Sequence, residues 1–143
     1  MDAASSSGNS TSRAASTGTI CVGGEDITIT EDNAFPIIDG ECGVVTVTAS
    51  NLGGSIANAR EVHMTGANNS INGEHWGELT IDRTTNTVNV DEMDHLVING
   101  DTNTVLASTI TRFEVYGDVN VVNWDDGAQA PVADTGRLNT YTR

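Results

Sequence analysis

The chain has 143 residues, of which 20 are Asp or Glu against six Arg and no Lys, and its formal net charge is −14. A surface of this charge repels phosphate backbones and anionic lipids, so nucleic acid and membrane surfaces are excluded as expected partners. No apolar run reaches the length of about 18 residues that a membrane-spanning helix needs, and we expect one domain without membrane insertion.

Residues 1–18 are rich in Ser, Thr, Ala and Gly. Such a segment buries too little apolar surface to order by itself, so we predict a flexible arm that folds onto a protein partner. Arg13 is the charged residue that we expect to contact this partner. The segment also lacks the basic start and apolar centre of a signal peptide. Either the protein is not exported by that route, or a signal has been removed ahead of it.

Cys21 and Cys42 are the two cysteines, and both precede the regular part of the sequence. A small even number of cysteines in a lysine-free, extracellular protein predicts one disulfide that fixes the first coil. The alternative is a pair of buried free thiols.

Apolar residues recur every 17 positions through the middle of the chain. One column is Val45, Val62, Leu79, Leu96 and Phe113, and a second is Val47, Met64, Ile81, Ile98 and Val115. This period is too short for a propeller blade or a helical-pair repeat and is typical of a β-solenoid. We therefore predict an all-β, single-domain parallel β-helix over residues 19–124, with about 17 residues per coil and roughly five to six coils.

Turn residues recur with the same period. Gly66, Gly100 and Gly117 share one place in the coil, where we predict a corner with positive φ. Four asparagines form another column: Asn69, Asn86, Asn103 and Asn120. Since stacked strands lie about 4.8 Å apart, we predict that these amides hydrogen-bond to one another along the axis and have a structural role.

The remaining inward positions and the end of the chain complete the predicted architecture. A third inward column is Trp76, Met93 and Ile110. The repeat fades after Trp124, which we expect to cover the last coil, and residues 125–143 are predicted to form a C-terminal cap or arm.

The search for chemistry gives few candidates. His63, His75 and His95 fall in different columns, so they do not stack into the three or four convergent ligands of a zinc site. One corner of the coil is acidic and is the candidate place for a Ca²⁺ ion. Its residues are Glu74, Asp91, Glu92, Asp125 and Asp126. We prefer a hydrated turn face there, and we expect no catalytic residues, no bound metal and no cofactor.

The pattern V-x-V-x-G-x-x-N-x-V resembles an uncharacterised family of exported actinobacterial proteins, a domain of unknown function. The likeness covers about Ile20 to Arg143 and includes Cys21, Cys42 and a closing stretch like Gly117 to Trp124. The resemblance implies a small parallel β-helix without an established activity. Members usually begin with a signal or lipoprotein sequence, which implies a place in the cell envelope.

These observations together predict a non-enzymatic display or stapling protein. Our first expectation is a virion decoration protein whose arm docks on a capsid or surface protein, with a homo-oligomer, a trimer as the expected form, at the virion surface. The alternative is an exported, extracellular β-solenoid of the cell envelope. A third class is a polysaccharide-binding or cleaving β-helix, for which Tyr116 and Tyr141 are few outward aromatics.

Overall fold

The computed structural model describes residues 13–14 and 18–143. All regular elements of this part of the chain are strands. They are β2 (Arg13–Ala14), β3 (Thr19–Cys21), β4 (Ile27–Ile29), β5 (Ile37–Val47), β6 (Gly53–Met64), β7 (Ser70–Ile81), β8 (Thr87–Ile98), β9 (Thr104–Val115), β10 (Val121–Gly127), β11 (Ala133–Asp134) and β12 (Thr140–Thr142). Most of the predicted N-terminal arm falls outside the described residues, as does the side chain of Arg13.

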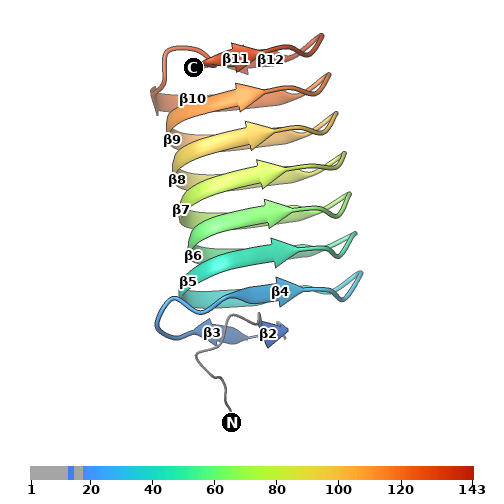
Figure 1. Cartoon of the computed structure of the whole chain (residues 1–143), viewed down its shortest axis with the longest axis vertical. Coiled ribbons are helices and arrows are strands. Elements are labelled where there is room, and N and C mark those ends of the chain that lie inside the picture. The colour runs from blue at the N-terminus through green and yellow to red at the C-terminus, as the bar shows by residue number, and fades with distance from the viewer. Residues whose placement is uncertain (1–12, 15–17) are drawn as a thin grey trace.

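The strands wind into a parallel β-solenoid, which confirms the predicted fold class. Figure 1 shows the turns stacked along one axis, each turn resting on the one before. From β5 to β9 the register advances by 17 residues per turn, as in the pairs Val62 with Leu79 and Leu79 with Leu96. Neighbouring turns pair along most of their length, so the backbone hydrogen bonds run between turns.

The solenoid has about seven turns, more than the five to six that the repeat predicts. The additional turns lie at the two ends, where the period lengthens. Ile27 pairs with Val45, 18 residues later, and Val121 pairs with Thr140, 19 residues later. Residues 125–143 extend the sheet through β11, which pairs with β9, and β12, which pairs with β10.

The core consists of the predicted inward columns. Alternation along each strand sends every second side chain into the solenoid, and the column from Val45 to Phe113 is fully buried. The third column is buried as well, with Trp76, Met93 and Ile110 at 1% exposure or less. At the C-terminal end, the rings of Trp124 and Tyr141 pack edge-on against Phe113. They cover the apolar interior that an open solenoid would expose.

The glycine corner differs from the prediction. Gly66, Gly100 and Gly117 do not have positive φ; that conformation belongs to the residue before each ladder asparagine. The positive-φ column is Asn51, Asn68, Thr85, Thr102 and Val119. The glycines are needed for a close approach instead, because a Cβ atom at Gly100 would collide with the carbonyl oxygen of Arg83 on the preceding turn.

The asparagine column is structural, but its hydrogen bonds go to the backbone rather than to neighbouring amides. Asn103 Oδ1 accepts from the N–H of Asn86 at 2.9 Å, and Asn103 Nδ2 donates to the carbonyl oxygen of Arg83 at 2.9 Å. Asn69, Asn86 and Asn120 repeat this pattern. These side chains therefore satisfy buried backbone groups at each corner, where strand pairing is interrupted. Asn139 continues the column one turn further.

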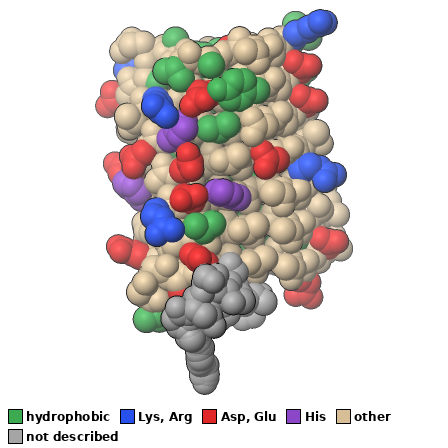
Figure 2. Space-filling view, in the orientation of Figure 1, with side chains coloured by type: hydrophobic (Ala, Val, Ile, Leu, Met, Phe, Trp, Pro, Cys, Tyr) green, Lys and Arg blue, Asp and Glu red, His purple; other side chains and the backbone are tan. Residues whose placement is uncertain are grey.

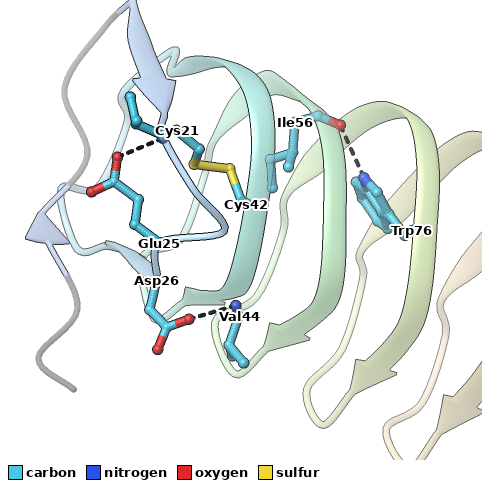
Figure 3. Close-up of a disulfide and its surroundings, with 8 residues drawn as sticks. Cys21, Glu25, Asp26, Cys42, Val44, Ile56 and Trp76 are labelled. Atoms are coloured by element: carbon cyan, nitrogen blue, oxygen red, sulfur yellow. Dashed lines mark hydrogen bonds between the residues drawn. A yellow bond between two sulfur atoms is a disulfide. The ribbon is translucent and has the colours of Figure 1, made fainter. Parts of the chain in front are cut away.

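A disulfide joins Cys21 of β3 to Cys42 of β5 and confirms the predicted pairing. Figure 3 shows it inside the first turns, with acidic side chains next to it that bond to the backbone. Asp26 Oδ1 accepts from the N–H of Val44 at 2.8 Å, and Glu25 Oε1 accepts from the N–H of Val22 at 3.0 Å. The first turn is thus fixed both covalently and by its own carboxylates.

Candidate functional site

One outward face of the solenoid gathers most of the histidine and carboxylate chemistry. Figure 2 shows histidine, acidic and arginine side chains close together on this face. Two neighbouring columns form it on β6 to β9. The first contains Glu61, Glu78, His95 and Arg112, and the second contains His63, Thr80, Val97 and Glu114.

Strand geometry explains why these residues meet. Glu61 and His63 are two residues apart and therefore point to the same side of β6, while Val62 between them is fully buried. In-register pairing then places Glu78 of β7 beside Glu61. Side chains from four turns thus form one continuous surface, which we call the histidine–carboxylate face.

Glu61, His63 and Glu78 form the first half of this face. His63 Nε2 lies 2.9 Å from Glu61 Oε1. One possible ligand atom from each of the three residues lies within 4.8 Å of the other two. All three side chains are partly exposed, so the group is open to solvent on its outer side.

His95 is the centre of the second half. Its Nδ1 lies 2.9 Å from Glu78 Oε2 on β7, and its Nε2 lies 2.6 Å from Glu114 Oε2 on β9. Arg112 extends the group, with a guanidinium nitrogen 3.9 Å from Glu114 Oε2. The imidazole therefore bridges carboxylates of the turns on both sides.

Tyr116 ends the chain of contacts. Its hydroxyl donates a hydrogen bond to Glu114 Oε1 at 2.5 Å. This bond and, after it, the bond from His95 lower the pKa of Glu114 below its ordinary value. The same bond raises the pKa of Tyr116, because ionisation would place two negative charges side by side.

The acidic corner that the sequence suggested as a Ca²⁺ site is arranged differently. Glu92 lies 3.2 Å from His75 Nδ1, and Asp126 lies 3.7 Å from the guanidinium of Arg143. The candidates Glu74, Asp91, Glu92, Asp125 and Asp126 form no group of three convergent ligand atoms within the described residues. These side chains lie along a solvent-facing edge.

The sequence analysis missed the carboxylates around the histidines. His63, His75 and His95 do lie in three separate columns, as expected. However, comparing histidines only within columns leaves out their neighbours two residues away on the same strand. The signal that could have found the site is the combination of Glu61 and His63 on one strand with Glu78 one period later.

A second feature lies at the N-terminal end of the solenoid, where large apolar side chains are exposed. They are Ile20, Val22, Phe35 and Ile37, with exposures of 61, 75, 63 and 39%. Ile20 pairs with Asp39, two residues from Ile37, so these residues lie near one another. The ring of Phe35 lies over Gly53, where a Cβ atom would be 3.3 Å away. We call these four residues the N-terminal apolar patch.

A shallow groove and the two tyrosines complete the surface. Glu41, Arg60, Gly77 and Asp94 are among the residues that line the groove, which thus carries charges of both signs. Tyr141 is half-buried against Phe113, while Tyr116 is exposed and bonded to Glu114. Within the described residues, no helix is long and apolar enough to cross a membrane.

The fold and the histidine–carboxylate face define this chain as a small disulfide-bonded parallel β-solenoid. Comparisons with models of known protein families, with curated proteins and with solved structures gave no match.

Proposed function

We propose that this protein is a non-enzymatic structural module displayed on the surface of a virion, and that it attaches through its N-terminal end. The observation that carries the proposal is the N-terminal apolar patch on the turn that the disulfide fixes. A cluster of exposed apolar side chains rimmed by polar residues is typical of a protein–protein contact. The predicted arm leads directly into the same end of the solenoid, so arm and patch are positioned to bind one partner.

The rest of the solenoid is suited to display. The inward columns and the asparagine ladder connect each turn to the next, which makes the body a stiff rod. The net charge of −14 keeps neighbouring copies from associating along their sides. We expect the protein to form a homo-oligomer, with a trimer as the expected form, and to bind a capsid or surface protein.

The second candidate is an exported protein of the cell envelope. The disulfide between Cys21 and Cys42 favours it, because disulfides persist in oxidising compartments outside the cytoplasm. The resemblance to exported actinobacterial proteins points the same way. In this alternative the N-terminal segment is a linker to the envelope.

Fractionation of the source culture separates the two. Particles and envelopes are resolved on a density gradient, and the protein is followed by immunoblot. Banding with particles is expected for a decoration protein, whereas banding with envelopes selects the second candidate. Recovery only as free protein contradicts both.

A matched pair of variants then tests the attachment surface. Phe35→Asp is expected to reduce co-migration with the assembly at least tenfold, because it places a charge in the apolar patch. Val132→Asp changes an equally exposed apolar residue, 64% against 63%, near the other end of the solenoid and is expected to have no effect. Equal losses from the two variants would contradict attachment through the N-terminal end.

A further inference from the structure

We propose that Glu61, His63 and Glu78 bind a first-row divalent transition metal, with Zn²⁺ as the probe ion. The three side chains come from β6 and β7, and one possible ligand atom of each lies within 4.8 Å of the others. They are a mixed set of one imidazole and two carboxylates held by paired strands. The inference concerns a different face from the N-terminal apolar patch and does not depend on the proposed function.

The electrostatics of this part of the face favour a cation. Glu61 and Glu78 are register partners on adjacent turns, about 4.8 Å apart along the axis. Like charges directly opposite on a sheet destabilise it. The guanidinium of Arg60 is 3.9 Å from Glu61 Oε2 but is 68% exposed, so it offsets little of this repulsion. A dication between the carboxylates would neutralise both.

The ligand types select the class of metal. Ca²⁺ and Mg²⁺ prefer sets made only of oxygen ligands, whereas an imidazole nitrogen with two carboxylates suits Zn²⁺ and its first-row neighbours. Metal–ligand distances of about 2.0–2.2 Å place tetrahedral ligand atoms roughly 3.3–3.5 Å apart. His63 Nε2 and Glu61 Oε1 lie 2.9 Å apart, so small side-chain rotations would admit the ion. The outer side remains open for water as a fourth ligand.

His95 supports the third ligand from outside the group. Its Nδ1 bonds to Oε2 of Glu78 at 2.9 Å, while its Nε2 is held by Glu114 at 2.6 Å. This contact orients the Glu78 carboxylate and directs Oε1 to the proposed ion. Hydrogen-bonded residues behind a ligand commonly orient metal sites in this way. Because the ligands come from two turns, the bound ion would cross-link β6 and β7 on the outside of the solenoid.

The test uses the full chain without a polyhistidine tag, treated with chelator and then titrated with Zn²⁺ by isothermal calorimetry. One equivalent is expected to bind, and Zn²⁺ is expected to raise the melting temperature. Glu78→Gln and His63→Ala are each expected to weaken binding at least tenfold. Both positions face outwards, and Glu61→Gln, which keeps the side-chain size, gives a third test if either variant folds poorly.

The control is the double variant His75→Ala, Glu92→Gln. It removes another exposed histidine–glutamate pair, 3.2 Å apart, that lacks a second convergent carboxylate. Binding is expected to be unchanged in this variant. The proposal is overturned if the wild-type chain shows no saturable binding up to millimolar Zn²⁺, or if the control loses as much affinity as His63→Ala.

Discussion

Trp76 and Gly73 share one space in the core, because a Cβ atom at Gly73 would lie 2.5 Å from the indole Nε1 of Trp76. Both residues point inwards on β7, and the indole N–H donates to the carbonyl oxygen of Ile56 at 2.9 Å (Figure 3). One turn later the same two positions hold Val90 and Met93, both buried. Each turn therefore fills its interior with a different combination of large and small side chains.

This pairing predicts a compensating double variant. Gly73→Val is expected to destabilise the fold by about 1–3 kcal/mol, since the added side chain overpacks the core against Trp76. Adding Trp76→Met is expected to recover part of this loss, because the combination already exists at Val90 and Met93. Urea unfolding of the four proteins of the cycle measures the coupling. Additive effects of the two substitutions would contradict the shared space.

The asparagine ladder predicts a large effect from one buried amide. Asn103→Ala is expected to lower the free energy of unfolding by about 2–4 kcal/mol, because it leaves the N–H of Asn86 and the carbonyl oxygen of Arg83 buried without partners. Asn99→Ala is the control, since its amide bonds to Asp82 at the surface, and it is expected to cost under about 0.5 kcal/mol. Equal losses in thermal unfolding would contradict the ladder's role.

The disulfide predicts a stability that depends on redox conditions. Cys21 and Cys42 are 21 residues apart, and closing a loop of this size stabilises a fold by about 3 kcal/mol. Reduction is expected to lower the melting temperature and to speed amide exchange in β3. The variant Cys21→Ala, Cys42→Ala should melt at the lower temperature with or without reductant. A reductant effect that persists in this variant would have another cause.

A branched residue in the positive-φ column predicts a stabilising substitution. Val119 has a φ of 58°, in a region that β-branched side chains rarely adopt, and it is 47% exposed. Asn51 and Asn68 occupy the equivalent place on earlier turns. Val119→Asn is therefore expected to raise the free energy of unfolding by about 1 kcal/mol, measured by urea denaturation. A lower stability would show that the valine side chain has a packing role.

The contact between Tyr116 and Glu114 predicts a pH window. The lowered pKa of Glu114 stabilises the fold above its unfolded pKa of about 4.3, and that contribution is lost as pH falls through the folded pKa. The raised pKa of Tyr116 stabilises the fold below about pH 10, and that contribution is lost as pH rises through the folded pKa.

Thermal unfolding of wild type and Tyr116→Phe across this range tests the window. The difference between them is expected to be largest between about pH 5 and 9 and to shrink at both extremes. In the Glu114→Gln background, Tyr116→Phe should have a smaller effect. A difference that does not change with pH would show that the hydroxyl acts through packing alone.

The fold could be predicted because one physical constraint repeats. Stacked turns place residues one period apart in contact, so Val62, Leu79 and Leu96 had to be alike for the core to close. At the ends the spacing changes, and Val121 pairs with Thr140 after 19 residues. A fixed period cannot follow such a change, and the outer turns were undercounted for that reason.

The corner and the outward face were harder to predict. A glycine is compatible with both positive φ and close backbone approach, so Gly100 alone does not distinguish them; the backbone shows the second. On the outward face, Glu61, His63 and Glu78 meet in two directions, along a strand and between strands. A repeat in one dimension shows only the second direction.

The asparagine ladder also has a direction. Asn120 Oδ1 accepts from the N–H of Asn103, and Asn120 Nδ2 donates to the carbonyl oxygen of Gly100, both on the turn before it. Asn139 does the same for Asn120 and Gly117. Each turn is thus completed by the segment that leaves the ribosome next, and a growing chain can add turns in the order of synthesis while only its newest corner waits for a partner.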